Sequence, residues 1–335
     1  MPLNVGIVGC GGIGKNHARQ YKAHKDVSFK CFVDIDKARA DAAAKEFGVK
    51  AYYSIADMLK NEQLDSISVC TAGAENGGHH YEATIQCLEG GLHVLCEKPI
   101  SNKVEEGRQM VAKAKELGKL LAINLNHRFT PMTHRAKGWI KEGKLGEGMF
   151  INMAMWINNK NETSPHFHIK ALHPHSIDII RFFAGPVKRV QCFMGKPSTR
   201  KVCWANLSLN MEFANGMVGH LTGSYEMGMQ YGIERCEFAG TKGRFVLDNM
   251  FELLTYYPRE GDEMTVVKNN IFGEGASFEL TFRNRIHRWV DQVIAKTPWD
   301  QVEGNGDEGL AATEVTEAAI QSFEGNNVVD LAGRG

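Results

Sequence analysis

The amino-acid sequence predicts an α/β protein in which a doubly wound parallel sheet is followed by an α+β domain with a large, mostly antiparallel open sheet. Short β-rich runs alternate with helix-like stretches up to about residue 122, and a glycine-rich turn follows the first apolar run. Short β-rich runs also crowd together between residues 187 and 257. A chain of 335 residues exceeds the usual size of one core, so we expect two domains, 1–122 and 123–335.

The N-terminal turn carries a Gly-x-Gly-x-x-Gly pattern at Gly9, Gly11 and Gly14, directly after the apolar run 4–8. In a Rossmann domain the first glycine permits a tight turn, the second lets the backbone approach a pyrophosphate, and the third lets the next helix pack on the sheet. Free N–H groups at the start of that helix face the phosphates. The expected dinucleotide contacts in this turn are Gly9, Gly11, Gly12, Ile13 and Gly14.

An acidic residue ends the second predicted strand, 28–33. Asp34 lies 20 residues after Gly14, the spacing at which a carboxylate accepts hydrogen bonds from the adenosine ribose. Its charge would repel a 2′-phosphate, so we expect NAD in preference to NADP, with Ile35 also at the cofactor. The alternative is that Asp34 only opens a turn in which Asp36 caps the next helix.

The remaining elements follow from hydrophobic spacing. In the first domain the further strands are 66–71, 93–96 and 120–124, and the helices are 13–24, 38–47, 79–89 and 104–117, with Gly48, Gly90, Gly91 and Gly118 at C-caps. In the second domain the expected helices are 134–142, 174–183, 280–294 and 310–323, and the strands are 187–194, 202–212, 217–225, 236–239 and 244–247.

Composition excludes several classes of partner. The 39 basic and 39 acidic residues give a net charge of zero, which does not favour nucleic acid or an anionic membrane surface. No apolar run reaches about 18 residues and no basic, apolar leader is present, so we expect a cytoplasmic protein without a membrane partner. The eight cysteines form no Cys-x-x-Cys pair, and we expect buried reduced thiols.

The string Glu97-Lys98-Pro99 follows the strand 93–96, at the edge where open parallel sheets bind ligands. Together with the N-terminal glycine pattern, it resembles the Gfo/Idh/MocA oxidoreductases. The likeness extends over nearly the whole chain, through VDID at 33–36, NHRF at 126–129, KLGE at 144–147 and HSIDIIRFFAG at 175–185.

The resemblance implies a two-domain NAD(P)-dependent dehydrogenase acting on a secondary alcohol, with Lys98 as a catalytic residue. An ammonium group can polarise a developing alkoxide, and partial burial and the positive nicotinamide lower the pKa of the lysine. Glu97 would orient Lys98 or the nicotinamide side, and we expect a cis peptide bond before Pro99. The alternative is an exposed lysine after a strand.

His175 matches the second catalytic position of the family, three residues before Asp178. An imidazole can take the proton of a substrate hydroxyl group near neutral pH. Pro174 suits a first helical turn, so we expect His175 at the head of a helix. The alternative is a capping or packing histidine. Members of the family carry an aspartate four residues before this histidine, where this chain has Ala171. Either another side chain makes the hydrogen bonds of that aspartate, or the reaction differs from simple alcohol oxidation.

The other site residues come from the same resemblance. His80 matches the loop histidine of the segment 73–82 and is expected at the cofactor with Thr71 and Ala72. The expected substrate contacts are Asn126, Arg128, Trp156, His173 and His175. Arg128 could equally form an interdomain salt bridge.

The segment 158–170 is either a loop lining the substrate pocket or a solvated loop. The histidines at 166, 168, 173 and 175 raise the alternative of a zinc site. We expect no metal, because the run contains no carboxylate or thiol.

We therefore predict an NAD-dependent oxidoreductase that transfers hydride between the nicotinamide and a secondary hydroxyl group of a sugar, cyclitol or glycoside. Lys98 and His175 would be its acid/base pair. Two alternative functions remain open. One is a glycoside-cleaving enzyme that uses transient oxidation and elimination. The other is a non-catalytic regulator that senses a dinucleotide or sugar. We also expect a homodimer or homotetramer joined through the second sheet.

Overall fold

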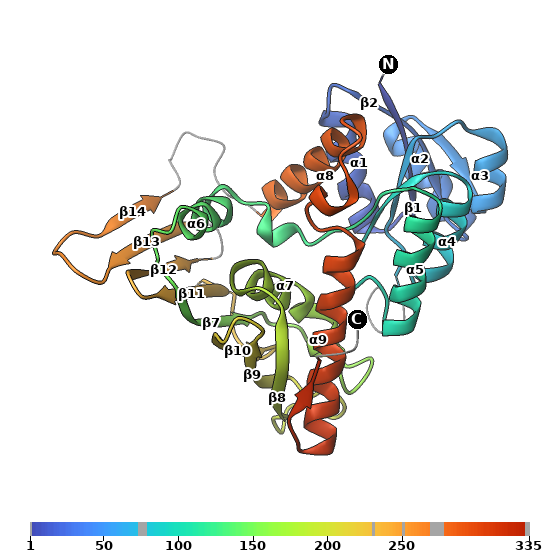
Figure 1. Ribbon diagram of the computed structural model, residues 1–335. Helices are drawn as coiled ribbons and strands as arrows, with labels where there is room; N and C mark the ends of the chain where they lie inside the picture. Colours follow the sequence, from blue (N-terminus) through green and yellow to red (C-terminus); the bar gives the residue numbers. More distant parts are fainter. Residues whose placement is uncertain (1, 73–78, 230–231, 250–251, 269–277, 332–335) are drawn as a thin grey trace. The chain divides into compact units, whose positions relative to one another are not determined.

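The computed structural model describes residues 2–72, 79–229, 232–249, 252–268 and 278–331 (Figure 1). The chain divides into two compact units. Unit 1 consists of Met1–Asn126 and Phe282–Thr313, and unit 2 consists of His127–Thr281 and Glu314–Gly335. The predicted boundary at 122/123 stays a proposal, and 282–313 lies in unit 1 although the sequence analysis placed it in the second domain.

Unit 1 is built on a six-stranded parallel sheet in the order β3-β2-β1-β4-β5-β6. The chain moves outward from β1 in one direction, then returns to start β4 on the other side, so the carboxyl ends of β1 and β4 form the switch point where such sheets bind ligands. The strands are β1 Leu3–Val8, β2 Val27–Val33, β3 Lys50–Tyr52, β4 Ser66–Val69, β5 His93–Cys96 and β6 Leu121–Ile123.

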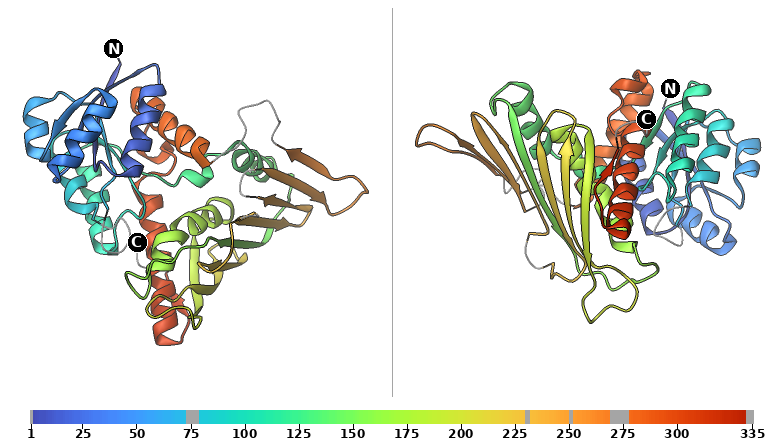
Figure 2. Two further views of the ribbon diagram at one scale, coloured as in Figure 1. Left: turned by 180° about the vertical axis from the view of Figure 1, so that it is seen from behind. Right: turned by 60° about the horizontal axis from the view of Figure 1, so that its bottom comes forward.

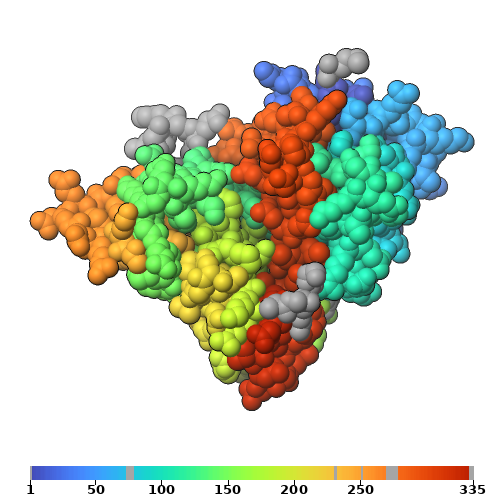
Figure 3. All heavy atoms as spheres, viewed as in Figure 1, coloured from blue at the N-terminus to red at the C-terminus, as the bar shows by residue number. Residues whose placement is uncertain are grey.

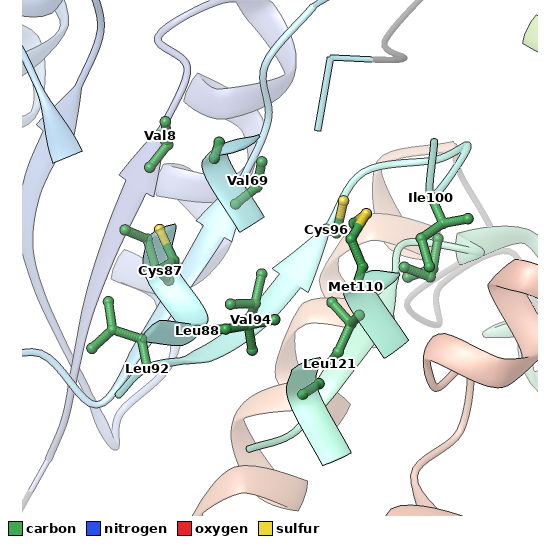
Figure 4. Packing of buried hydrophobic residues seen from close by; sticks show 14 of the residues in the cluster. Val8, Val69, Cys87, Leu88, Leu92, Val94, Cys96, Ile100, Met110 and Leu121 are labelled. Atoms are coloured by element: carbon green, nitrogen blue, oxygen red, sulfur yellow. The ribbon is translucent and has the colours of Figure 1, made fainter. Parts of the chain in front are cut away.

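Helices cover both faces of this sheet. One core contains Val94, Met110 and Leu121 under α4 and α5 (Figure 4). The opposite core receives Trp289 and Ile286 from α8, and both side chains are fully buried. The helices with residues in unit 1 are α1 Gly12–Ala23, α2 Lys37–Phe47, α3 Ile55–Asn61, α4 Tyr81–Glu89, α5 Val104–Glu116, α8 Phe278–Ile294, the 3-10 turn η2 Trp299–Gln301 and the first part of α9 Gly306–Gly325.

Unit 2 is built on a nine-stranded sheet in the order β14-β13-β12-β11-β7-β10-β9-β8-β15. Neighbouring strands are antiparallel except β7 and β10, so the predicted fold class is confirmed. The strands are β7 Gly148–Trp156, β8 Val187–Gly195, β9 Asn206–Phe213, β10 Val218–Ser224, β11 Glu234–Gly240, β12 Gly243–Asp248, β13 Leu253–Pro258, β14 Thr265–Lys268 and β15 Val329–Asp330.

Helix α7, Phe167–Ala184, lies against β7, β9, β10 and β11, and α6, Pro131–Lys141, lies against β12 and β13 (Figure 2). The start expected for α7 at residue 174 is wrong, because the helix begins seven residues earlier and Pro174 lies inside it. Pro174 removes only one backbone hydrogen-bond donor from the helix. The side chains of Phe167, Ala171 and Leu172 are buried together, and this packing stabilises the helical turns before Pro174. The expected loop 158–170 therefore ends at residue 166.

Strand β9 begins at Asn206, four residues after the expected start. The backbone N–H groups of Lys201, Val202 and Cys203 donate to the Glu162 carboxylate at 2.6–3.0 Å. These amides are therefore unavailable to the sheet.

Three other expectations from the sequence are met: buried thiols, a glycine at the end of α2 and a cis bond before Pro99. All eight cysteines are buried and free. Gly48 ends α2 with a φ of +68°, and the Lys98–Pro99 bond is cis. In the part of the chain that the structure describes, no helix is long and apolar enough to cross a membrane.

The open face of the unit 2 sheet carries charged side chains. Side chains that alternate with the buried ones include Arg189 and Glu212, which pair across β8 and β9, and Arg235, which pairs with Asp248. Phe193 is an exposed apolar side chain on this face, and Figure 3 shows the β14 side chains at the surface in orange. The oligomer therefore stays a prediction that rests on the size of the face instead of its apolarity.

We expect light scattering at micromolar concentration to give a mass that is a multiple of 37.2 kDa. An exposed sheet of this size offers both a face and the edge strand β14 to a second copy. A mass equal to that of one chain at all concentrations would refute the prediction.

Candidate active site

The glycine turn after β1 has the geometry that a dinucleotide needs. Gly9 has a φ of +95°, and a Cβ atom there would overlap the carbonyl of Cys70. A Cβ atom on Gly14 would overlap the carbonyl oxygen of Gly9, whereas one on Gly11 or Gly12 would have no atom within 4 Å. No side chain caps the start of α1 at Gly11. The turn thus has open space beside free helix amides, which fits a pyrophosphate.

The Asp34 carboxylate lies at the end of β2, beside this turn. Its Oδ2 accepts a hydrogen bond from the Cys10 backbone N–H at 2.9 Å, and its Oδ1 accepts one from Asp36 N–H at 3.0 Å. Asp36 caps α2, as expected if Asp34 only opens the turn before this helix. Each carboxylate oxygen has a second lone pair, so the ribose contact stays a compatible prediction. Ile35 beside it is 93% exposed.

The residues that follow β4 lie near the Lys98–Pro99 segment. The His80 ring is buried, with Nδ1 2.8 Å from the carbonyl oxygen of Pro99 and Nε2 3.0 Å from that of Thr71. Burial lowers the pKa of His80, and the hydrogen bond to Pro99 opposes that shift. Ala72 is exposed. The predicted loop 73–82 lies outside the described residues from 73 to 78.

Lys98 follows β5 and is partly buried. Burial lowers the pKa of Lys98, and the neighbouring Glu97 carboxylate opposes part of that shift. The Lys98 backbone N–H donates to Glu97 Oε2 at 3.3 Å. Lowering the pKa of a lysine makes its ammonium a better proton donor near neutral pH.

The Glu97 carboxylate is fixed by two buried side chains. His17 Nε2 lies 2.9 Å from Glu97 Oε1, and Asn124 Nδ2 donates to the same oxygen at 2.5 Å. Burial alone would raise the pKa of Glu97, but His17, Asn124 and the Lys98 charge outweigh burial and lower it. The His17 ring is held in turn by Ser68 Oγ at 3.0 Å. A fixed, ionised Glu97 therefore lies beside Lys98.

In unit 2 the His175 ring stacks on His127. The ring centroids are 3.9 Å apart and the planes differ by 8°. His127 Nδ1 lies 2.8 Å from Glu234 Oε2, and both residues are buried. His175 comes from the middle of α7, not from a helix start, so its expected place at the head of the helix is wrong.

Arg128 forms a buried ion pair with Asp178. Its Nε donates to Asp178 Oδ2 at 2.8 Å, and its Nη2 donates to Oδ1. Both side chains are about 2% exposed. This pair lies within unit 2. A salt bridge between the domains and a direct contact between Arg128 and substrate both stay predictions.

The histidines of α7 do not converge on one point. His173 Nε2 lies 3.0 Å from His168 Nε2, and its Nδ1 lies 3.0 Å from Ser176 Oγ. Burial lowers the pKa of His168 to about 3. His166 pairs with Glu324 at 2.9 Å. Within the described ranges, no group of three histidine, cysteine or acidic side chains is arranged to hold a metal ion.

The remaining predicted substrate residues are Asn126, Trp156 and His173. Asn126 is buried at the start of the 3-10 turn η1, Asn126–Arg128, and Trp156 is partly buried at the end of β7. His173 has both ring nitrogens hydrogen-bonded inside unit 2. Contacts of all three with substrate stay predictions.

Comparison with protein families decides what this chain is. Residues 3–125 match the family model described as the oxidoreductase family with an NAD-binding Rossmann fold, and residues 135–246 match the GFO/IDH/MocA C-terminal domain. The chain belongs to the Gfo/Idh/MocA family. It is an NAD-dependent oxidoreductase, and the glycine turn lies in its NAD-binding domain.

Several relatives align over nearly their whole length. D-glucoside 3-dehydrogenase of Escherichia coli K12 is 27% identical and covers 98% of each chain. Myo-inositol 2-dehydrogenase of Thermotoga maritima is 24% identical with the same coverage. Levoglucosan dehydrogenase in complex with NADH and levoglucosan has a TM-score of 0.89 at 20% identity, covering 98% of this chain and 99% of that one. An Agrobacterium radiobacter oxidoreductase in complex with NAD+, L-tartaric acid and magnesium has a TM-score of 0.89 at 17% identity over both whole chains.

Sequence reasoning missed three buried side chains of this Gfo/Idh/MocA protein. His127 belongs to the quoted string NHRF but received no role. Glu234 and His17 also received none, although a buried acid on a strand and a histidine in the first helix are unusual choices for a core. The burial that marks these polar residues is seen only in the structure.

We expect the Gfo/Idh/MocA protein to bind NAD more tightly than NADP, and Asp34→Ser to reduce that preference. The negative carboxylate repels a 2′-phosphate, and Arg39 lies only 3.9 Å from Asp34, ready to face a phosphate once the acid is gone. Fluorescence titration of both cofactors measures the ratio. Asp57→Ser, on α3, is the matched control. Equal affinities in the wild type would show that Asp34 serves only the turn.

Proposed function

We propose that the enzyme transfers hydride between NAD and a secondary hydroxyl group of a sugar, cyclitol or glycoside. The relatives named above act, by name, on a glucoside, on inositol and on levoglucosan. These compounds are rings with several neighbouring hydroxyl groups. The formal net charge of zero agrees with such an uncharged substrate.

The position of Lys98 is the observation that carries the proposal. It follows β5 at the same sheet edge as the glycine turn after β1, and burial lowers its pKa. When bound, NAD accepts or supplies the hydride. Lys98 then donates a hydrogen bond to the substrate oxygen and stabilises the negative charge that develops there. Glu97 keeps the lysine in place.

His175 is the proposed base that takes the hydroxyl proton during oxidation. A histidine side chain exchanges protons near neutral pH without a large change in its surroundings. The Ala171 position supplies no carboxylate in this chain. Within unit 2, the Glu234 carboxylate contacts His127, and the His127 ring stacks on the ring of His175.

The test is a screen of glycosides, inositols and anhydrosugars for NADH formation, with free aglycone measured in parallel. Formation of NADH with one of these classes supports the proposal. Release of aglycone without net NADH would replace it by transient oxidation and elimination. Cofactor binding with sugar binding but no product would replace it by a regulator.

A further inference from the structure

A buried polar chain in unit 1 ends on the Glu97 carboxylate. Its members are Tyr21 and His17 of α1 and Ser68 of β4. Tyr21 Oη lies 2.6 Å from Ser68 Oγ. His17 Nδ1 lies 3.0 Å from the same Oγ, and His17 Nε2 lies 2.9 Å from Glu97 Oε1. All three members are fully buried, so bulk water does not hydrate their polar atoms.

The hydrogen atoms of this chain can be placed by counting donors and acceptors. Within the described part of the protein, Ser68 Oγ is the only hydrogen-bond partner of the Tyr21 hydroxyl group. A buried hydroxyl hydrogen without an acceptor is costly, so Tyr21 donates to Ser68. Ser68 then donates its own hydrogen atom to His17 Nδ1, which must carry a lone pair. The hydrogen atom of the neutral imidazole is therefore on Nε2 and points to Glu97 Oε1.

The reverse direction satisfies fewer of these groups. If His17 Nδ1 carried a hydrogen atom, it would donate to Ser68, and Ser68 would have to donate to Tyr21. The Tyr21 hydrogen atom would then have no acceptor among the described residues. In the neutral ring, Nε2 would also present a lone pair to the Glu97 carboxylate, which repels it. The chain therefore has one favoured direction, from Tyr21 to Glu97.

Two donors converge on Glu97 Oε1. Asn124 Nδ2 also donates to this oxygen and lies 3.4 Å from His17 Nε2, as expected of two donors that share one acceptor. Hydrogen bonds to a carboxylate favour its charged form. Burial would raise the pKa of Glu97, but the bonds from His17 and Asn124 contribute to lowering it. The donor chain therefore helps to keep a buried carboxylate ionised.

The charge of Glu97 matters for its neighbour Lys98. Burial raises the pKa of the Cys70 and Cys96 thiols and lowers that of His80, so these three neighbours are uncharged near neutral pH. Burial also lowers the pKa of Lys98, and the Glu97 charge opposes that shift. Without this charge, Lys98 would lose its proton more readily and could no longer stabilise an alkoxide.

We propose that Tyr21, Ser68 and His17 are positioning residues that point one hydrogen atom at Glu97 and so keep its carboxylate ionised beside Lys98. This inference rests on the proposed role of Lys98 in hydride transfer. Because the chain ends at a fully buried Tyr21, it orients hydrogen atoms and does not carry protons to water. Its members act on the reaction only through Glu97.

Histidine-selective ¹⁵N labelling and long-range ¹H–¹⁵N NMR spectra show which His17 nitrogen carries hydrogen, without any substrate. In the wild-type protein at about pH 7 we expect hydrogen on Nε2 and a lone pair on Nδ1. His17→Gln removes these signals and so assigns them. Hydrogen on Nδ1 in the wild type, alone or together with Nε2, would overturn the proposal.

Tyr21→Phe keeps the ring in the core but removes the hydroxyl group that starts the chain. Ser68 Oγ then lacks a donor, and a hydrogen atom on His17 Nδ1 can take that place, so we expect Nδ1-protonated His17 to appear. Tyr52→Phe is the matched control, because it removes a hydroxyl group that donates to Glu62 at 2.6 Å in the same unit. It should leave the His17 signals as in the wild type. Unchanged His17 signals in Tyr21→Phe would overturn the proposal.

The His17 variants are then assayed with a substrate found in the screen. His17→Leu removes a donor to the Glu97 carboxylate, so we expect kcat to fall by roughly tenfold to a hundredfold with KM nearly unchanged. His17→Gln keeps an N–H donor for the carboxylate and should recover most of the turnover. Equal losses of kcat in the two variants would show that His17 only fills space, and would overturn the proposal.

The two proposals fail in different ways. If no sugar is oxidised by the wild-type enzyme, the proposed function fails and the NMR spectra still decide the direction of the donor chain. If Lys98→Met abolishes turnover but His17→Leu leaves kcat unchanged, the function stands and this inference is wrong.

Discussion

Lys98→Met should lower the rate of hydride transfer by roughly a hundredfold to ten-thousandfold while NAD binds almost as in the wild type. Methionine keeps the length of the side chain but can neither donate a hydrogen bond nor carry the charge that stabilises an alkoxide. The side chain follows β5, whereas the pyrophosphate is expected at the glycine turn after β1, so cofactor affinity should change little. Single-turnover kinetics and a separate NAD titration measure the two effects.

Lys103→Met is the control for this variant. Lys103 is exposed, pairs with Glu106 at 2.9 Å, and precedes α5 at the surface. Its replacement should leave both measurements unchanged. Turnover in Lys98→Met equal to that of the wild type would refute the catalytic assignment of Lys98.

Asp178→Ala should destabilise the protein by about 3–5 kcal/mol, because it leaves the Arg128 guanidinium buried without its carboxylate. Both side chains are almost fully buried, and the guanidinium binds both carboxylate oxygens of Asp178. Urea unfolding followed by circular dichroism gives the change in unfolding free energy. The protein should therefore unfold at a clearly lower urea concentration.

Asp248→Ala removes the partner of Arg235 from a largely exposed ion pair and provides the comparison. An exposed pair contributes only about 0–1 kcal/mol. If the two variants unfold at the same urea concentration, the buried ion pair between Arg128 and Asp178 does not stabilise the protein as predicted.

The first domain could be predicted well because its signals are local. The strand at 93–96, the glycine turn and the C-caps each depend on a few neighbouring residues, and the structure has β5 at His93–Cys96 as expected. The strand β3 and the helix α3 were missed, since three and seven residues carry too little periodicity to recognise.

The second domain was harder because its elements depend on contacts between distant residues. Pro174 predicted a helix start, but the buried side chains before it extend the helix. The carboxylate of Glu162 takes the amides that would have lengthened β9, and no pattern near residue 202 indicates this. The strands β13 and β14 were not among the five strands expected by their bounds in the second domain, although β13 begins within the β-rich region 187–257.

The residues of the candidate site also differ in whether a local sequence signal indicates them. Lys98 and His175 were found through short strings that a family resemblance supplies. His127 and Glu234 are brought together only by the fold of the sheet, so sequence spacing gives no sign of them.

The discontinuous make-up of unit 1 has a consequence for how the chain folds as it is synthesised. The buried side chains of Ile286, Trp289 and Val290 complete one face of the first sheet, yet they are translated more than 150 residues after β6. When the first 126 residues leave the ribosome, Ile7, Phe32 and Leu95 therefore have only part of their cover. Although N-terminal domains usually fold first, this one stays open on one face until most of unit 2 has been made. Chaperones that bind apolar surface would meet this face while residues 127–281 are being made.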